Sequence, residues 1–529
     1  MKEKIDWDSE SVVDVLVVGY GPVGAALAAL LGHFGVRTLV IDRNRDILML
    51  PRAIALDNEA LRILQMVGLN DQSFERIGIQ EVRMHCPYVG QFGSVNTSGT
   101  IDCHPKLVTF YQPDLERALR QQVTAQASVM IQTETELVDL QQQAEGVIAM
   151  IKSVDGKEHT ILARYLVGAD GASSRVRGLI GQAFEGETYA EDWLIVDARG
   201  REDNAIDHVE FICDPRRPTP HMPAPGGRER WEFMLHPDEK RSDMELPEKL
   251  AEILAPWSKT EKIQIERQAI YRFHARCCDV FQKERVFLAG DAAHITPPFV
   301  GQGLVAGLRD AANLAWKLAW VVQGKAGTNI LQSYDQERRP HARQMIDLAR
   351  FMGKLVMPTS VMRAVALHGF MRAVGLIPPL RRYFEELKIK PPNRFSKGLF
   401  HAGKGKGLLL RGAQLPQDWL RTSQGVQLSD DVLGQRLVLL GIGIDPAAGL
   451  DAATRKAWEA AGGGFLHLGL RGQSSTGDTA FAEAMGNAFV MGEPKGWLVV
   501  VRPDQVMMLD GPPTDALRLV KRTLAMLNG

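Results

Sequence analysis

Apolar runs that end in glycine-rich turns predict buried strands followed by helices. Val12–Val18 and Thr38–Ile41 are apolar, β-branched runs, and an amphipathic helix ending at Phe34 is expected between them. Val286–Ala289 is a third buried run, which has no polar alternation, and a long helix is expected over residues 304–324. Strands that alternate with helices in this way are typical of an α/β fold with a parallel sheet.

The pattern changes twice along the chain. Between residues 193 and 280, short strand-like runs punctuated by Pro and Gly predict an antiparallel sheet in a separate layer. Residues 331–343 are expected to be helical up to Pro340, where the helix should break or restart. Beyond a Pro- and Gly-rich linker at residues 391–407, alternating strands and helices predict a small third α/β unit.

These shifts predict three domains. The parallel-sheet domain is expected to be discontinuous, over residues 1–80, 101–190 and 281–390. The antiparallel sheet domain takes residues 81–100 and 191–280, and the third unit takes residues 400–529. A chain of 529 residues is long enough for two or three domains.

The first strand runs into Gly19-Tyr20-Gly21-Pro22-Val23-Gly24, which matches G-x-G-x-x-G, and Asp42 ends the next strand eighteen residues after Gly24. In a strand–turn–helix setting this spacing is a dinucleotide-binding signal. Gly19 permits the tight turn, Gly21 lets backbone approach a pyrophosphate, and Gly24 lets helix and strand pack closely. Asp42 would accept hydrogen bonds from a ribose. The alternative is a plain glycine turn with a solvated acid.

A second candidate segment begins where the strand 286–289 ends. Gly290 and Asp291 come at its carboxyl end, where ligands bind in open α/β sheets. Pro297 and Pro298 keep the following loop out of a helix, and residues 301–303 (Gly-Gln-Gly) then open the long helix. A helix that begins at glycines presents unpaired N–H groups and a positive dipole end. A carboxylate beside such an end suits a cofactor with a polyol chain and a ring that becomes anionic on reduction.

Three further stretches are candidates for cofactor contact. Arg52 lies in a loop before a predicted helix, Gln112 precedes a Pro that suits a first helical turn, and Asp170-Gly171 opens a Ser-capped turn that leads to Arg177. Each has an ordinary alternative: a surface arginine, a capping glutamine and a capped turn.

Composition excludes several functions. Net charge is −1, which gives no electrostatic case for nucleic acid or an anionic membrane. The five cysteines form neither a C-x-x-C motif nor a zinc spacing, and none lies in the third unit, so no metal site and no thiol redox chemistry are expected. The charged N-terminus has no apolar signal core, and no run of about 18 apolar residues is present. A cytoplasmic protein is expected.

Together, G-Y-G-P-V-G with Asp42, G-A-D-G-A-S-S-R-V-R, and G-D-A-A-H-I-T-P-P-F-V-G-Q-G resemble the single-component flavin aromatic hydroxylases of the para-hydroxybenzoate hydroxylase type. The likeness covers roughly residues 10–385. The longer form of the chain is similar to 3-(3-hydroxyphenyl)propionate, phenol and polyketide hydroxylases. The resemblance implies a Rossmann-like FAD-binding domain, an inserted antiparallel β-sheet substrate domain and a C-terminal thioredoxin-like domain without redox function.

The resemblance also implies roles for individual residues. The three glycines would hold the FAD pyrophosphate, Asp42 the adenosine ribose and Asp291 the ribityl hydroxyls, and the segment from Asp170 to Arg177 would serve both FAD and NAD(P)H. Relatives often have Asn where Val305 stands, so one side-chain contact to the flavin is lost and the backbone amide remains. The expected cofactor-binding residues are Gly19, Gly21, Pro22, Val23, Gly24, Asp42, Arg43, Arg52, Gln112, Asp170, Gly171, Arg177, Gly290, Asp291, Pro298, Gly301, Gly303, Leu304 and Val305.

The implied reaction is hydroxylation of a phenol. NADH or NADPH would bind transiently and reduce FAD, and O2 would add to the flavin as a hydroperoxide that transfers oxygen to a ring carbon ortho or para to the hydroxyl. Pro298 belongs to an apolar wall, Pro297-Pro298-Phe299-Val300, that would exclude water. Candidates for the group that polarises the phenol are His221 and Tyr271, followed by His236 and Arg230. Each is also an ordinary structural residue.

The first substrate to test is a 3-hydroxyphenyl alkanoate, whose carboxylate would need a cation such as Arg230 or Arg216. The alternatives are another phenol, a resorcinol, an N-heteroaromatic or a polyketide. A flavin oxidase or dehydrogenase and a non-enzymatic binding protein also stay open, whereas the W-x-W-x-I-P motif of halogenases is absent. The protein is expected to be a monomer or homodimer.

Overall fold

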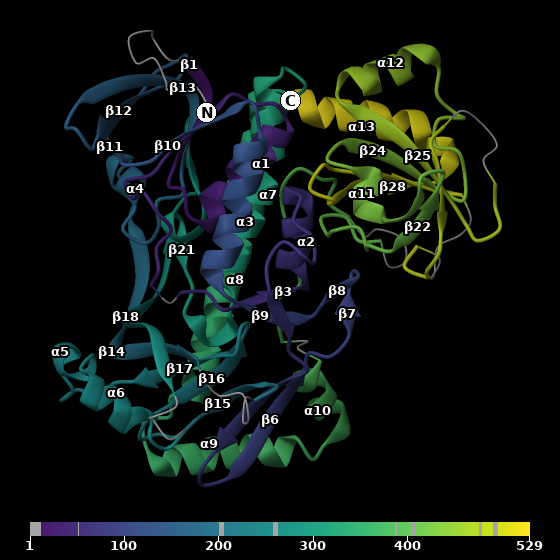
Figure 1. Cartoon of the computed structure of the whole chain (residues 1–529). Helices are drawn as coiled ribbons and strands as arrows, with labels where there is room; N and C mark the ends of the chain where they lie inside the picture. The colour runs from purple at the N-terminus through teal and green to yellow at the C-terminus, as the bar shows by residue number, and fades with distance from the viewer. Residues whose placement is uncertain are drawn as a thin grey trace.

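The computed structural model describes residues 12–50, 52–199, 206–257, 263–386, 389–403, 409–474, 479–489 and 496–529. Residues 404–408 of the predicted linker lie outside the described residues. Figure 1 shows three parts: a first sheet with its helices, a second sheet below it, and a separate C-terminal unit.

The first sheet contains the predicted parallel strands. Its parallel core has the order β10-β2-β1-β13-β20, and β13 continues into an antiparallel hairpin with β12 and β11. The bounds are β1 (Val12–Val18), β2 (Thr38–Ile41), β10 (Val129–Gln132), β11 (Thr135–Gln142), β12 (Val147–Ser153), β13 (Glu158–Gly168), β19 (Gln282–Lys283) and β20 (Val286–Leu288).

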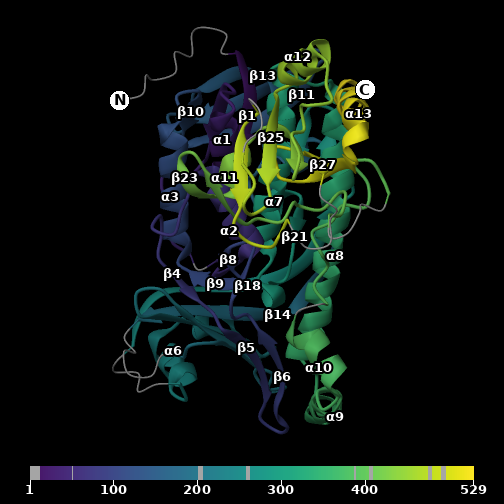
Figure 2. The same ribbon diagram turned by 90° about the vertical axis from the view of Figure 1, so that its right-hand side faces the viewer.

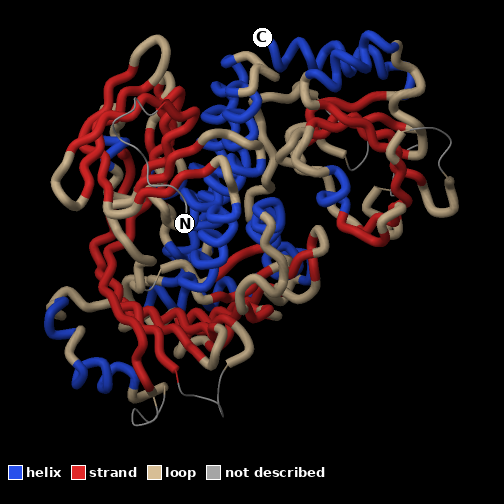
Figure 3. Tube along the Cα trace, turned by 45° about the horizontal axis from the view of Figure 1, so that its top comes forward, coloured by secondary structure: helices blue, strands red, loops and turns tan. Residues whose placement is uncertain are grey.

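Helices α1 (Pro22–His33), α3 (Gln112–Ala125) and α7 (Gly303–Val322) pack beside this sheet. Alanines and leucines on α1 are fully buried because it packs against both α3 and α7. Figure 3 shows these helices between the first sheet and the sheet of the C-terminal unit. The smaller elements nearby are β3 (Ala55–Asp57), α2 (Asn58–Val67), β4 (Arg76–Gly78), β7 (Thr100–Ile101), β8 (His104–Pro105), β9 (Leu107–Phe110) and α4 (Arg175–Leu179).

A second sheet, which we call the roof sheet, has the strand order β21-β18-β14-β17-β16-β15-β5-β6. It is antiparallel as predicted, except that β15 and β5 pair in parallel. β14 begins at Phe184, before the predicted boundary at residue 191. The bounds are β5 (Glu81–Cys86), β6 (Gly90–Asn96), β14 (Phe184–Arg199), β15 (Val209–Ile212), β16 (Thr219–Ala224), β17 (Arg228–Met234), β18 (Gln264–Cys278) and β21 (His294–Ile295), with α5 (Arg241–Met244) and α6 (Pro247–Leu254) outside it.

The expected helix break at Pro340 is wrong. Helix α8 (Gln332–Val356) continues through Pro340 and runs most of the length of the molecule in Figure 2. A proline removes one backbone hydrogen bond, but buried residues on both sides of it, among them Arg338 and Met345, hold the helix in place. Two shorter helices follow, α9 (Val361–Val374) and α10 (Pro378–Glu385).

The C-terminal unit is a seven-stranded sheet in the order β23-β22-β26-β25-β24-β27-β28. Strands β26, β25 and β24 are parallel, β27 is antiparallel to β24, and β28 is antiparallel to β27, which agrees with the expected thioredoxin-like α/β unit. The bounds are β22 (Trp419–Thr422), β23 (Gly425–Leu428), α11 (Ser429–Leu433), β24 (Leu437–Ile442), α12 (Ala452–Ala460), β25 (Gly463–Gly469), β26 (Phe481–Ala484), β27 (Trp497–Val501), β28 (Met507–Gly511) and α13 (Ala516–Asn528).

Buried ion pairs fasten this unit to α8. Arg502 donates hydrogen bonds of 2.7 and 2.9 Å to the carboxylate of Glu337 in α8. Lys317 of α7 donates to the same carboxylate at 2.8 Å, and all three side chains are buried. Neighbouring cations lower the pKa of Glu337 well below its usual range, so the carboxylate stays charged.

No individual helix in the described part of the chain has the length and apolar composition of a membrane span. α9 and α10 satisfy that test only when this sharply bent pair is taken together.

Candidate functional site

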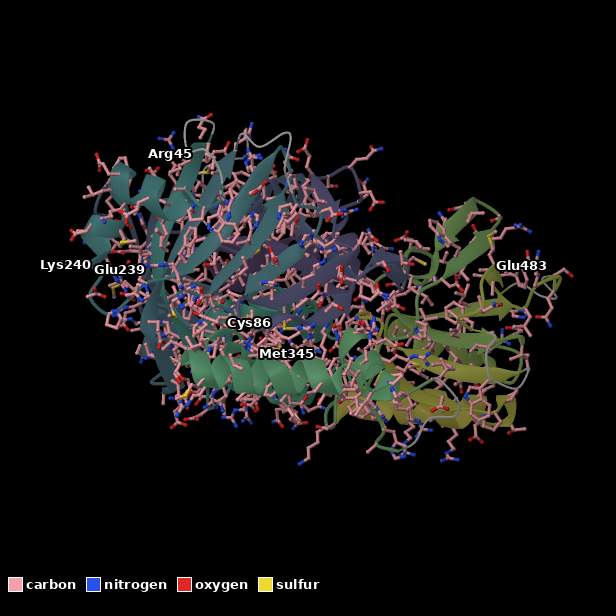
Figure 4. All side chains as sticks on the ribbon, turned by 90° about the horizontal axis from the view of Figure 1, so that it is seen from below. Arg45, Cys86, Glu239, Lys240, Met345 and Glu483 are labelled. Carbon is pink, nitrogen blue, oxygen red and sulfur yellow. The ribbon has the colours of Figure 1, made fainter. Side chains whose placement is uncertain are left out.

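A cavity of roughly 1660 Å³ lies between the carboxyl edge of the first sheet and the roof sheet. The glycine turn after β1, the start of α7 and the roof strands all contribute to its wall. In the view from below, Met345, which lines the cavity, lies between Glu483 of the C-terminal unit and Glu239 and Lys240 at the opposite end of the molecule (Figure 4).

The three glycines of the first motif have distinct positions. Gly19 has φ +107°, which a side chain would strain, and a Cβ on Gly24 would lie 2.0 Å from the Gly19 carbonyl oxygen. Gly21 precedes α1, and a Cβ placed there would meet nothing within 4 Å. Gly19 and Gly21 both line the cavity, but only Gly21 faces open space at the helix N-terminus, because a Cβ on Gly19 would lie 2.3 Å from the Ala169 carbonyl oxygen; Gly24 serves the packing of α1 on the strand.

Asp42 lines the cavity beside this turn. Its carboxylate accepts hydrogen bonds of 2.7 Å from the backbone N–H of Tyr20 and of Asn44. These bonds fix the carboxylate at the end of β2, at the position expected for a ribose contact. The exposed Arg43 lines the same part of the cavity.

Asp291 is the other carboxylate of the site. It follows β20 in a short 3-10 turn and lines the cavity, and burial raises its pKa while the nearby Arg52 opposes that shift. No hydrogen bond to its carboxylate occurs among the described residues. A half-buried carboxylate without a protein partner is suited to accept hydrogen bonds from ligand hydroxyls.

Helix α7 presents its N-terminus to the cavity through Gly303 and Leu304. Gln302 precedes the helix, but its side chain makes no cap bond because it is held by Asp57 and Arg309. The first-turn amides of α7 therefore remain available to an anion or a polarised oxygen in the cavity.

These observations fit FAD. Two helix N-termini, at Gly21 and Gly303, and the unpartnered carboxylate of Asp291 line one continuous cavity. The other expected contacts that line it are Pro22, Val23, Arg43, Arg52, Gln112, Asp170, Gly171, Pro298 and Gly301. Their roles toward FAD stay predictions.

Four expected cofactor residues do not line the cavity. Gly24 packs as described above. Gly290 has φ +60°, and a Cβ there would crowd Val23, so it serves helix packing. Val305 is fully buried, so only its backbone can act. Arg177 donates hydrogen bonds to the carbonyl oxygens of Ala292 and Ala172, which makes it a structural tie between segments.

Asp170 lines the cavity but is engaged locally. Its carboxylate accepts hydrogen bonds from the Ser174 hydroxyl at 2.5 Å and from the amides of Arg175 and Val176 at 2.7 and 3.1 Å. The ordinary alternative, a capped turn, describes these contacts.

His221 does not reach the cavity, so it is withdrawn as the phenol-polarising group. Its Nε2 lies 2.8 Å from Glu229, its ring stacks on Trp231, and it is 2% exposed. Side chains of a strand alternate between faces, and on β16 the neighbours Pro220 and Met222 line the cavity instead.

His236 and Arg216 lie outside the cavity wall as well. Arg216 is exposed and pairs with Asp214 at 2.9 Å, so it is withdrawn as the partner of a substrate carboxylate. Tyr271 of β18 does line the cavity, and its buried hydroxyl has no partner among the described residues. Burial raises the pKa of Tyr271, which keeps the hydroxyl protonated.

Arg230 of β17 also lines the cavity. Its guanidinium donates hydrogen bonds of 2.6 and 3.0 Å to Asp197, and Arg267 donates to the same carboxylate. Two buried guanidinium groups share one carboxylate here, so this group of three carries a net positive charge.

Two parts of the cavity wall were not predicted from the sequence patterns. Glu232 on β17 lines the cavity with 8% of its surface exposed. Lys390 and residues 391–393 of the connection to the C-terminal unit, together with Gln414, line it from another side. Among the described residues, no group of three or more His, Cys, Asp or Glu side chains could hold a metal ion.

Comparison with known proteins agrees with this site. A family described as FAD binding domain matches residues 12–349, and one described as HcaD C-terminal domain matches residues 412–526. A 3-(3-hydroxy-phenyl)propionate/3-hydroxycinnamic acid hydroxylase of Burkholderia vietnamiensis is 35% identical, covering 98% of this chain and 96% of that protein. A hydroxylase of the same name from Comamonas testosteroni is 32% identical, covering 98% of both.

Two solved structures share the fold. The flavin-dependent monooxygenase PieE, in complex with FAD and substrate, has a TM-score of 0.81 and 21% identity, covering 97% of this chain and 99% of that chain. Aklavinone-11 hydroxylase with FAD and aklavinone has a TM-score of 0.75 and 24% identity, with the same coverage. FAD is the cofactor, and NAD(P)H and O2 are the usual co-substrates of such hydroxylases. The chain belongs to the FAD-binding family of aromatic hydroxylases.

Proposed function

We propose that this protein hydroxylates a 3-hydroxyphenyl alkanoate, such as 3-(3-hydroxyphenyl)propionate, ortho to its ring hydroxyl. The observation that carries the proposal is the near-full-length similarity to two hydroxylases named for that substrate. The cavity adds a chemical argument, since one apolar wall and one cationic group lie on its roof side.

Bound FAD, reduced by NADH or NADPH, supplies the oxygen-activating chemistry when it is present. The chain's own residues do the rest. Gly21 and the N-terminus of α7 bind the anionic parts of the cofactor, and Asp291 binds its hydroxyls. Phe299 is buried among Trp193 and Phe273, so this side of the cavity excludes water.

The substrate carboxylate would bind to the Arg230–Asp197–Arg267 group. Two guanidinium groups share one carboxylate here, so one positive charge is left unbalanced. The substrate carboxylate would neutralise it, and because both guanidinium groups are already buried, no solvated cation would have to lose its water. The flat ring would lie against apolar side chains of the roof sheet and α8, which include Ile195, Phe211, Met222 and Met352.

The experiment is a panel of phenols given to the purified, yellow holoenzyme, scored for stimulated NADH or NADPH oxidation, O2 uptake and the mass of the product. We expect the largest stimulation and a product heavier by one oxygen with 3-(3-hydroxyphenyl)propionate. A resorcinol, an N-heteroaromatic or a polyketide that is hydroxylated instead would replace this substrate. Oxygen uptake without a hydroxylated product would indicate a flavin oxidase.

Monomer or homodimer, the choice between NADH and NADPH, the three domain boundaries and a cytoplasmic location remain predictions. Size-exclusion chromatography with light scattering measures the oligomeric state, and the same panel of phenols run with NADH and with NADPH measures the nucleotide preference.

A further inference from the structure

The roof sheet carries one acidic side chain whose position the proposed function does not use. Glu232 lies on β17 and lines the cavity, where it is 8% exposed. The other buried carboxylates on β14 and β17 have partners. Asp197 pairs with Arg230 and Arg267, and Glu229 pairs with His221. The carboxyl of Glu232 has no hydrogen bond or ion pair among the described residues.

Strand register places Glu232 on the cavity face. On β14, Ile195 pairs with Glu232 of β17, and Trp193, two positions earlier, pairs with Tyr271 of β18. Residues paired across strands project to the same face, and so do residues two apart on one strand. Ile195 and Tyr271 both line the cavity, so the Glu232 carboxyl and the unpartnered Tyr271 hydroxyl share one face.

A buried carboxyl without a protein partner is costly unless a ligand satisfies it. The cavity here must accept a phenol, whose hydroxyl is a hydrogen-bond donor that a carboxylate oxygen can accept. We propose, on the basis of the proposed function, that Glu232 accepts the hydrogen bond of the substrate's ring hydroxyl and takes its proton during hydroxylation.

The step balances as a simple proton transfer. The phenolic O–H bond breaks, its electron pair stays on the ring oxygen, and the proton moves to a carboxylate oxygen of Glu232. The resulting phenolate has a more electron-rich ring at the ortho and para carbons. The proton returns to the oxygen or leaves to solvent when the product departs, so Glu232 ends in its starting state.

The charges around Glu232 tune its protonation near neutral pH. Burial raises the pKa of Glu232 to about 7, Arg230 on the same strand opposes the shift, and Asp197 on β14 adds to it. Arg267 and Tyr271 on β18 and Arg52 from the loop before β3 are the other charged or titratable groups on this side of the cavity. A general base is most effective when its pKa lies near the working pH.

The first test compares binding of 3-(3-hydroxyphenyl)propionate with its 3-methoxy analogue, which lacks the hydroxyl proton, to the holoenzyme. Flavin absorbance changes report both affinities. We expect the wild-type protein to prefer the phenol by about tenfold at pH 8, and Glu232→Gln to reduce that preference severalfold. Glu229→Gln, a buried glutamate on the same strand facing His221, is the matched control and should keep the preference.

The second test follows product formation against pH with saturating substrate. Wild-type turnover should rise as pH increases through about 7, and Glu232→Gln should lower turnover on the order of a hundredfold and abolish that rise.

Should Glu232→Gln fail to retain FAD, Glu232→Asp keeps a carboxylate and is expected to keep the phenol preference. A Glu232→Gln holoenzyme with unchanged phenol preference and an unchanged pH profile overturns the inference. Failure of the wild-type enzyme to hydroxylate any phenol rejects the proposed function instead, and the binding comparison still decides the role of Glu232.

Discussion

Arg62 of α2 donates hydrogen bonds of 2.6 and 2.7 Å to both carboxylate oxygens of Asp430 in α11, 368 residues further along the chain. Both side chains are buried, and Arg62 also donates to the Leu415 carbonyl at 2.7 Å. This bidentate pair fastens the C-terminal unit to the FAD-binding part. Breaking one side of it leaves a charge without a partner in a buried site.

We therefore expect Arg62→Met to lower the free energy of unfolding by on the order of 3–5 kcal/mol. The double variant Arg62→Met, Asp430→Leu should recover part of that loss, because the buried Asp430 charge is removed with its partner and only Asp102, which lies 3.3 Å from Arg62, loses its cation. Chemical denaturation of the holoenzyme measures both. Equal destabilisation by the single and double variants would contradict this account.

The glycine motif offers a matched pair of substitutions. A Cβ on Gly21 meets nothing within 4 Å, whereas one on Gly24 would lie 2.0 Å from the Gly19 carbonyl oxygen. We expect Gly21→Ala to leave apoprotein stability nearly unchanged but to weaken FAD binding, because the methyl group enters the cavity. Gly24→Ala should instead lower the melting temperature of the apoprotein. Thermal melts and FAD titration distinguish them, and similar effects of the two would argue against our placement of the cofactor.

Asp291 is expected to contribute directly to FAD affinity. Its carboxylate lines the cavity without a partner, and hydrogen bonds to charged groups contribute roughly 1.5–3 kcal/mol each. Asp291→Ala should therefore weaken FAD binding about tenfold to a hundredfold, measured by quenching of flavin fluorescence. The exposed Asp238→Ala serves as the control. Unaltered affinity in Asp291→Ala would remove this residue from the cofactor site.

The contact between His104 and the C-terminal unit should make stability depend on pH. His104 Nε2 lies 2.9 Å from Gln65 Oε1 and 3.2 Å from Gln417 Nε2. Burial lowers the pKa of His104 to about 4, so the unfolded chain, with an ordinary pKa near 6.5, binds the proton more tightly. This contribution is complete above pH 6.5 and is lost progressively as pH falls toward 4.

His104→Asn removes the titrating ring. The melting temperature of the wild-type protein should exceed that of His104→Asn at pH 7.5, and the difference should shrink between pH 6.5 and 4.5. Melting curves in a buffer series measure it. A difference that stays constant over this range would show that His104 protonation does not control stability.

Sequence patterns predicted the cofactor side of the molecule well. Thr38–Ile41 and Val12–Val18 form strands with the predicted bounds, and α7 begins one residue before the expected position. These segments could be predicted because the glycine motif and the apolar runs determine the structure of their own stretch of chain, through backbone geometry and burial.

The roof sheet was harder to predict for a physical reason. Its strands β16 and β17 are buried on both faces, so hydrophobic alternation does not tell which of their residues meet the cavity. His221 and Met222 are both buried, yet only Met222 lines the cavity. Strand β16 contains Pro220 and Pro223, and because proline is uncommon inside a strand, the sequence pattern favours a loop there.

The cavity wall includes Val18 at the end of β1 as well as residues 390–393 and Gln414 of the connection to the C-terminal unit. During synthesis on the ribosome, Val18 and Gln414 emerge about four hundred residues apart. A nascent chain that has completed only its glycine turn therefore lacks the last wall of the compartment. The cavity is therefore fully enclosed only after residues up to Gln414 have left the ribosome.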